Sequence, residues 1–204
     1  MVFRRLSEEQ FRKLHKASLH VLEKTGVRIL EPRAIEIFKK GGCKITDNNL
    51  VTVPVKLVEW ALDVSPKEIT IYDQKGSPAL ILSGKKAFYG NGSDLLFIID
   101  HRTGNIRKAI LKDVIEIVSL IDRLQTMDFV MSGFIPSDIH EKKVQRLQML
   151  TMLDYTHKPI IYVTTDLQNT RWNVKMAEIV AEGSDTLRKR PFAANYINLS
   201  LIHI

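Results

Sequence analysis

A regular alternation of helical and strand-like segments occupies the chain from residue 111 onward. Each helical segment has apolar residues at the spacing of one helix face, and each strand-like segment is a short, nearly continuous apolar run. The repeat of about 30 to 40 residues is the size of a βα unit, which predicts parallel strands joined by helices. The predicted helices span residues 113–124, 141–154 and 167–182, and the predicted strands span residues 128–133, 158–165 and 192–198.

A fourth strand is predicted at residues 87–90, AFYG, ahead of this repeat. Four βα units are half of an eight-stranded barrel, and a doubly wound sheet would show the same rhythm. The doubly wound alternative lacks support, because no strand is followed by the G-x-G-x-x-G turn of dinucleotide-binding folds. The expected fold class is therefore α/β, with the N-terminal half of a (β/α)8 TIM-type barrel favoured over a doubly wound sheet.

Residues 1–86 predict a different kind of region, made of helices and a β-hairpin. Ser7 and Gln10 have the spacing of a capping box, and Gly26 is placed to end the helix behind it. Prolines and glycines bound two further helices, and period-two alternation marks the strands. The expected segments are helices 7–26, 32–40 and 54–65 and strands 68–72 and 79–82. A second hairpin, of strands 95–100 and 105–110, is expected after the strand at residues 87–90.

The segment AFYGNGSD, residues 87–94, is the most informative stretch for function. Asn91, Ser93 and Asp94 put three short polar groups just beyond a buried strand, and the glycines permit a tight turn or a close approach to a ligand. In α/β folds the substrate site usually lies at the carboxyl ends of the strands. We therefore expect this turn to face a binding site.

Composition excludes several classes of function. The chain is 45% hydrophobic and 26% charged, which is enough for a core, and no apolar run is long enough to span a membrane. Although the net charge is +7, the basic residues are scattered and have no interleaved aromatic residues, so we expect no nucleic-acid partner.

Cys43 is the only cysteine, and we interpret it as structural in a cytoplasmic protein. His140 and His157 have no second ligand at metal spacing, so no metal site is expected.

The assembled pattern resembles the trimethylamine methyltransferase family of corrinoid-dependent methyltransferases, which act on methylated amines such as trimethylamine or glycine betaine. The matching pieces include LSEEQ, ITIYDQKGSPAL, FYGNGSD with FIIDHRTGNIRKAILKDV, DRLQTMDFVMSG, THKPIIYVTTD and RPFAANYIN. They span nearly all of residues 6 to 198, and their order and spacing are specific.

The resemblance implies methyl transfer from an amine to the cobalt of a corrinoid carried by a separate cognate protein, with no cofactor bound directly. It also implies a longer complete protein that is a homo-oligomer, of which residues 87–198 form the first four barrel strands. We therefore expect the 204-residue chain to be inactive alone. The ending LSLIHI, residues 199–204, departs from the family and is interpreted as a non-native tail.

A methylated cation needs aromatic faces or carboxylates around it. The resemblance therefore makes polar and aromatic residues at the strand ends candidates for substrate binding, while no catalytic residue can be named. The candidates are Tyr89, Asn91, Ser93, Asp94, Thr165, Tyr196 and Asn198.

Structural roles remain open for several of these candidates. Asp94 can serve only to cap the turn, Tyr196 can be part of the core, and Thr165 can precede a helix whose N-cap is Asp166. A non-catalytic α/β module that binds a small ligand is the alternative function.

Overall fold

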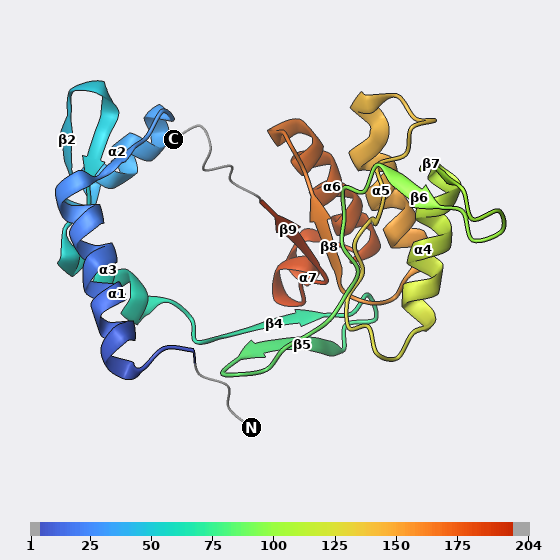
Figure 1. The fold of residues 1–204 in the computed structure, drawn as a ribbon, viewed down its shortest axis with the longest axis horizontal. Coiled ribbons are helices and arrows are strands. Elements are labelled where there is room, and N and C mark those ends of the chain that lie inside the picture. Colours follow the sequence, from blue (N-terminus) through green and yellow to red (C-terminus); the bar gives the residue numbers. More distant parts are fainter. Residues whose placement is uncertain (1–4, 198–204) are drawn as a thin grey trace. The chain divides into compact units, whose positions relative to one another are not determined.

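The computed structural model describes residues 5–197, and these divide after Pro66 into two compact units. In the first unit, helix α1 (Glu8–His20) begins with the predicted capping box (Figure 1). Gln10 N donates to Ser7 Oγ at 3.2 Å, and Ser7 N donates to Gln10 Oε1 at 2.8 Å. A π-helical turn η1 (Val21–Thr25) continues α1 as far as Gly26, whose φ of 75° ends the helix as expected.

The other two predicted helices of this unit are confirmed as α2 (Pro32–Lys40) and α3 (Val55–Val64). The unit also contains a small antiparallel sheet of order β1-β3-β2, which the sequence analysis did not predict. Strands of two or three residues are too short to show an alternating pattern. They are β1 (Val27–Arg28), β2 (Lys44–Thr46) and β3 (Leu50–Thr52), with a 3-10 turn η2 (Asp47–Asn49) before β3.

The second unit begins with an antiparallel hairpin of β4 (Glu68–Tyr72) and β5 (Pro78–Ser83). The sequence pattern places this hairpin in the N-terminal region 1–86, whereas in the structure it belongs to the unit that begins at Lys67. Its hydrogen bonds give the reason. Tyr72 N donates to Pro191 O at 2.8 Å, and Gln74 N donates to His157 O at 2.9 Å. The hairpin is thereby attached to the segments that lead into the last two strands.

Four parallel segments form the centre of the second unit, and they lie side by side in sequence order. Gly90 is bridged to Phe129, and Val130 is bridged to Ile160, both in parallel. Strand β8 (Ile160–Val163) then pairs in parallel with β9 (Ala193–Tyr196). The α/β class is therefore confirmed, and the neighbour order is the one expected for consecutive βα units.

The segment around Phe129 makes only isolated bridges and is not the regular strand predicted for residues 128–133. Two local features interrupt its ladder. Gly133 has a φ of 72°, and Phe134 N turns back to donate to Ser132 O at 2.8 Å. The apolar run predicted a buried segment correctly, but the turn at Gly133 ends the extended backbone early.

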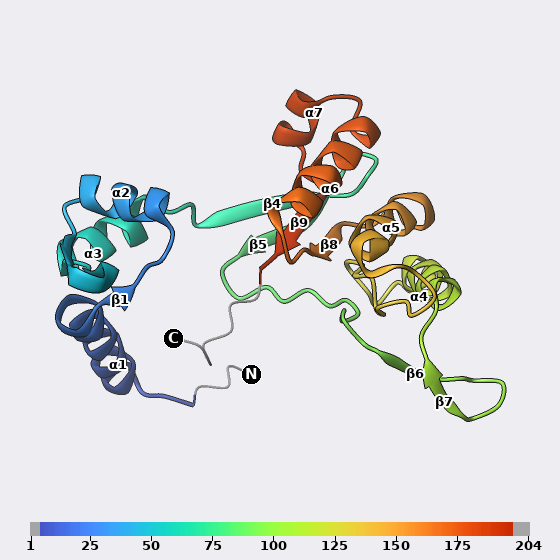
Figure 2. The same cartoon turned by 90° about the horizontal axis from the view of Figure 1, so that it is seen from above.

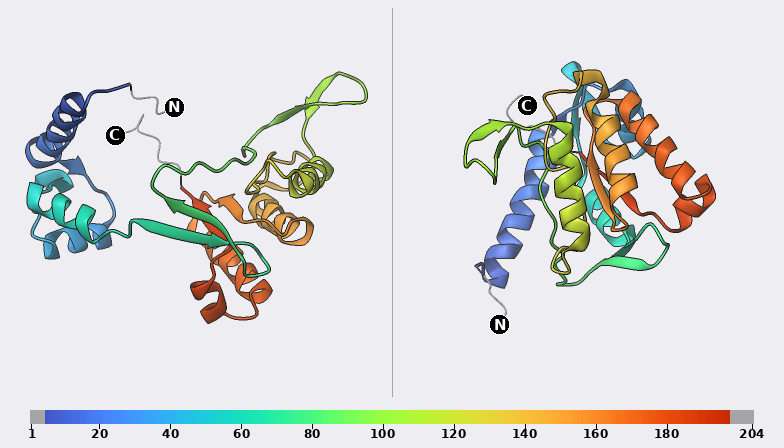
Figure 3. Two further views of the ribbon diagram at one scale, coloured as in Figure 1. Left: turned by 90° about the horizontal axis from the view of Figure 1, so that it is seen from below. Right: turned by 90° about the vertical axis from the view of Figure 1, so that its right-hand side faces the viewer.

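Three helices cover one face of the parallel segments, and Figure 3 shows α4, α5 and α6 side by side. These are α4 (Leu111–Arg123), α5 (Glu141–Tyr155) and α6 (Leu167–Val180), and a short α7 (Ser184–Lys189) precedes β9. The predicted helix over residues 167–182 thus ends at Val180, and α7 was not predicted. Among the described residues, no helix is both long enough and apolar enough to cross a membrane.

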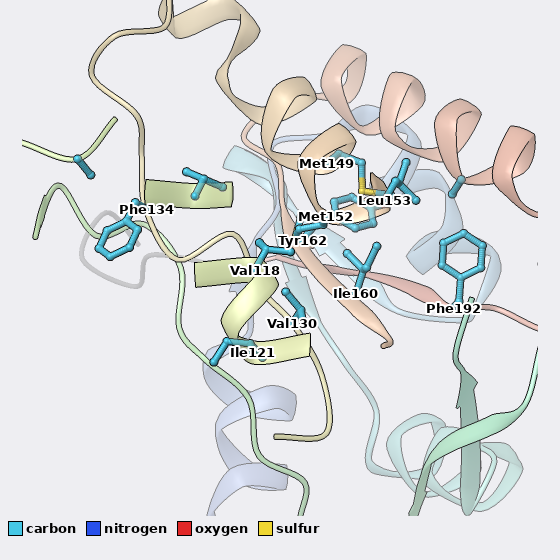
Figure 4. Packing of buried hydrophobic residues seen from close by; sticks show 13 residues of the cluster. Val118, Ile121, Val130, Phe134, Met149, Met152, Leu153, Ile160, Tyr162 and Phe192 are labelled. Carbon is cyan, nitrogen blue, oxygen red and sulfur yellow. The ribbon is translucent and has the colours of Figure 1, made fainter. Parts of the chain in front are cut away.

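The core lies between these helices and the parallel segments (Figure 4). Val114, Val118 and Ile121 of α4 are fully or almost fully buried, as the spacing of their predicted stripe requires. Met149 and Met152 of α5 face the strands from the neighbouring position. Burying each such side chain contributes about 1.5 to 3 kcal/mol, so this layer holds the parallel segments in place.

Lys158 ties the end of α4 to the start of β8. Its Nζ donates to the carbonyl oxygens of Ile121 (2.7 Å), Leu124 (2.6 Å) and Met127 (2.7 Å). The last carbonyls of a helix have no partner within the helix and carry partial negative charge. One ammonium group therefore satisfies three acceptors where α4 ends, at the amino-terminal end of the parallel segments.

A second ionic cluster fixes the hairpin of β6 (Phe97–Ile99) and β7 (Ile106–Lys108), which Figure 2 shows extending beyond α4. Arg107 donates from Nη1 and Nη2 to both oxygens of Asp113 at 2.7 Å, and from Nε to Asp100 at 2.9 Å. Asp113 lies in the first turn of α4 and is buried, and its Oδ2 also accepts from Ile110 N at 2.8 Å. These hydrogen bonds hold the pKa of Asp113 below its usual value and lower the pKa of Asp100 to about 2.

We predict that Lys158→Met destabilises the second unit by about 2 to 3 kcal/mol, because three carbonyl groups lose a charged donor. The measurement is urea unfolding in a Trp60→Phe background, so that fluorescence reports Trp172 of α6. Lys175→Met removes an exposed lysine of α6 and should change stability by less than about 0.5 kcal/mol. Equal effects of the two substitutions would contradict the role of Lys158.

We predict that Asp113→Asn lowers the free energy of unfolding by about 2 to 3 kcal/mol at pH 7. Because the folded pKa of Asp113 is depressed, its contribution is present above the unfolded value near 4 and is lost as pH falls through the folded value. The difference from the wild type should therefore shrink progressively as the pH falls below about 5, measured by the same fluorescence. The exposed Asp154→Asn variant serves as a control and should remain close to the wild type throughout this range.

Candidate functional site

A cavity of about 360 Å³ lies at the carboxyl ends of the parallel segments. It is formed by the turn after the first segment, by one face of α5, and by the end of β8. We call it the acidic cavity. The lining residues are Asp94, Ile135, Glu141, Val144, Gln145, Gln148, Val163 and Thr165.

The acidic cavity combines an apolar wall with negative charge. Ile135, Val144 and Val163 supply the apolar surface, and the carboxylates are those of Asp94 and Glu141. No lysine, arginine or histidine is among its lining residues. Apolar walls suit methyl groups and unpaired carboxylates suit a cation, so the cavity has the chemistry to hold a small methylated ammonium.

Asp94 has the backbone conformation of a turn and also lines the acidic cavity. Its φ of 63° is in the left-handed region, which aspartate adopts more readily than most residues. Ser93 Oγ donates to Asp94 Oδ2 at 3.1 Å. The turn role and the cavity position are therefore compatible for Asp94.

Thr165 is held in the cavity wall by a side chain of α5. Gln145 Nε2 donates to Thr165 Oγ1 at 2.9 Å, and Thr165 N donates to Gln145 Oε1 at 3.3 Å. The next residue, Asp166, is the N-cap of α6, because its Oδ1 accepts from Asn169 N at 2.7 Å. Hydrogen bonds from Asn169 lower the pKa of Asp166, so this carboxylate is engaged in capping.

The amide of Asn91 bridges two parallel segments. Its Oδ1 accepts from Met131 N and its Nδ2 donates to Met131 O, both at 2.8 Å. A side chain thus takes the place of a backbone partner at the point where the strand ladder stops. Gly90 lies so close to Phe129 that an added Cβ would meet its ring at 2.4 Å, whereas Gly92 has open space around it. The first glycine of the turn is therefore required for close packing.

Two further predicted residues, Tyr89 and Tyr196, do not line the acidic cavity. Tyr89 is 66% exposed, and its backbone pairs with Asp128. Tyr196 is 51% exposed and is paired with Val163 across the β8–β9 ladder. Because Ile160 and Tyr162 face the helices, alternation puts Tyr196 on the opposite face, beside the cavity wall. Asn198 lies outside the described residues.

Three polar cavity residues were missed by the sequence analysis. Glu141, Gln145 and Gln148 lie at positions i, i+4 and i+7 of α5, so they share one helix face. Their common helix face could have identified these three residues as site candidates from the sequence.

Arg107 and Lys158 were also missed. The partners of Lys158 are 31 to 37 residues away in the chain, and those of Arg107 lie on either side of its strand, one of them at a helix start. Cys43, in the first unit, is buried, and burial raises the pKa of its thiol, in agreement with a structural role.

A second depression, of about 540 Å³, adjoins the acidic cavity across the Gln145–Thr165 contact. Its charged residues are two acidic ones, Glu141 and Asp166, and two basic ones, Lys142 and Arg146. Since the charges cancel, this depression has no clear preference for an ion of either sign.

Comparison with known proteins gives a consistent result along the chain. Residues 1–201 match the family described as trimethylamine methyltransferase (MTTB). The chain is also 31% identical over 171 residues to trimethylamine methyltransferase MttB of Desulfitobacterium hafniense (strain DSM 10664 / DCB-2). That alignment covers 83% of this chain and 34% of the relative, so the chain spans about a third of the relative's length.

We predict that Asn91→Ala speeds hydrogen exchange at the Met131 amide about tenfold, because its acceptor is removed and the two segments separate more easily. Exchange measured by NMR or by mass spectrometry of peptides around residue 131 would detect the change. Ser93→Ala, in the same turn, should leave Met131 unaffected, since Ser93 contacts Asp94. Unchanged protection of Met131 in the Asn91 variant would contradict the bridging role.

Proposed function

The chain belongs to the trimethylamine methyltransferase family, and we propose that its second unit supplies part of the methylamine-binding site of such an enzyme. The observation that carries this proposal is the acidic cavity, in which two carboxylates and an apolar wall meet at the carboxyl ends of parallel segments. This is the end at which barrel enzymes assemble their sites. The methyl donor is a methylated amine, and trimethylamine and glycine betaine both fit this description.

The reaction proposed is a displacement at carbon. The bond between the methyl carbon and the amine nitrogen breaks, the nitrogen keeps the electron pair, and the methyl group moves to the acceptor. The acceptor is the reduced cobalt of a corrinoid carried by a separate protein, which supplies the nucleophilic electron pair. This chain's residues have the complementary task of holding the cation with one methyl group accessible.

Asp94 and Glu141 favour entry of a cation, because opposite charge lowers its free energy in the cavity. Ile135, Val144 and Val163 exclude water from the methyl groups. Tyr196, on the adjacent strand face, would extend this wall toward the next strand.

We further propose that the parallel segments are the first four strands of a (β/α)8 barrel. Within the described residues β9 pairs only with β8, so its other edge is available to a further strand. The relative's greater length leaves room for the additional units. We expect the complete protein to carry out methyl transfer and the 204-residue chain alone to give none, because half of the barrel wall is missing.

We predict that Asp94→Asn combined with Glu141→Gln raises the KM of the complete protein for its methylated amine about tenfold, with a smaller effect on kcat, because ground-state attraction is lost. The loss of absorbance of the reduced corrinoid measures the methyl transfer. Glu116→Gln, an exposed carboxylate of α4, should leave KM unchanged.

Two outcomes would contradict the proposal. An unchanged KM in the double variant would remove the acidic cavity from the amine site. Binding of amines by the complete protein without any methyl transfer would favour the alternative, a small-ligand-binding module.

A further inference from the structure

Gln148 is a buried polar side chain in the wall of the acidic cavity. It keeps only 6% of its surface accessible and belongs to the cavity lining. It comes from the face of α5 that also carries Glu141 and Gln145. A buried amide normally has partners for both its oxygen and its nitrogen.

The orientation of this amide is fixed by its nitrogen. Gln148 Nε2 donates to the carbonyl oxygen of Phe134 at 2.7 Å and contacts Ser132 Oγ at 3.2 Å. A backbone carbonyl can only accept a hydrogen bond, so the atom near Phe134 O must be the NH₂ group. The position of the amide oxygen follows from this assignment, without ambiguity between the two ends of the group.

The oxygen Oε1 is the unused half of this amide. Among the described residues none donates a hydrogen bond to Oε1. Asn195 Oδ1 and both amide atoms of Asn173 also lack a partner and are fully enclosed, but Oε1 of Gln148 does not belong to that enclosed group. Gln148 lines the acidic cavity, and Oε1 is the polar atom of this side chain that its own hydrogen bonds leave available to a ligand. The acidic cavity thus contains a rigid, uncharged acceptor in addition to its two carboxylates.

A rigid acceptor distinguishes between two kinds of methylated cation. A protonated tertiary amine, such as trimethylammonium, has one N–H that can donate to Oε1. A quaternary ammonium has the same charge and no N–H, so it would leave Oε1 without a hydrogen bond. Sites built to accept a hydrogen bond discriminate strongly against analogues that lack the donor.

We propose that Gln148 is a specificity-determining residue that accepts the N–H of a protonated amine and so favours tertiary over quaternary ammonium ligands. This inference rests on the proposed function, because it places the amine in the acidic cavity. The carboxylates of Asp94 and Glu141 attract both kinds of cation through charge, and Gln148 adds an acceptor that is fixed in orientation and that only the tertiary ammonium can use. The part of the preference that Gln148 contributes can therefore be removed without removing the charge.

The test is a calorimetric or NMR titration of the 204-residue chain at pH 7 with trimethylammonium chloride and with tetramethylammonium chloride. We expect the dissociation constant for trimethylammonium to be about tenfold lower, the effect of one charge-assisted hydrogen bond. In Gln148→Met, which has similar volume and no amide acceptor, the ratio of the two dissociation constants should fall several-fold. Gln125→Met, an exposed glutamine outside the cavity, should keep the wild-type preference.

Equal binding of the two cations by the wild type, or tighter binding of tetramethylammonium, would overturn the role of Gln148 while leaving the cation site intact. A preference of unchanged size in Gln148→Met would overturn it as well. Binding of neither cation by the wild type would instead remove the amine from the acidic cavity, and the proposed site would fail together with this inference. The wild-type comparison needs no variant, so it decides the proposal even if Gln148→Met does not fold.

Discussion

Parallel pairing of four backbone segments is the constraint on which the second unit depends. The segments around Gly90 and Val130, together with β8 and β9, run in the same direction and lie in sequence order. Parallel neighbours require a crossover between them, and here each of the three connections contains a helix that packs on the segments. The apolar stripes of α4, α5 and α6 follow from that requirement, and their packing on Val130 and Ile160 holds the segments together.

The two ends of these segments are held in different ways. At the amino-terminal end, Lys158 satisfies three carbonyl groups around the end of α4, and Gln74 attaches the β4–β5 hairpin to the residues before β8. At the carboxyl end, polar side chains of α5 line a cavity, and the carboxylates of Asp94 and Glu141 have no basic partner there. Hydrogen bonds between polar groups stabilise the amino-terminal end. At the carboxyl end, carboxylates without a basic partner remain available to a ligand.

The predicted helices were placed well because their boundaries depend on local chemistry. The capping box of Ser7, the proline that begins α2 and the glycine that ends α1 act within one or two turns of the chain. The segment at residues 128–133 was less regular than predicted, since Gly133 turns the backbone and Asn91 supplies a side-chain partner from another segment. Two of the predicted site residues, Asp94 and Thr165, line the cavity. Gln148 was not predicted, because the orientation of its amide is set by a hydrogen bond to Phe134 O that the sequence does not reveal.

The amino-acid sequence by itself determined the α/β class, the helix stripes, the polar turn after the first strand and the family resemblance, since each depends on residues close together in the chain or on their order along it. Only the tertiary structure decided which polar groups meet. Side chains from the turn at Asp94, from α5 and from the end of β8 are up to about seventy residues apart and converge because parallel strands end at one edge. The free oxygen of Gln148 likewise exists as a binding feature only because folding occupies the nitrogen of the same amide.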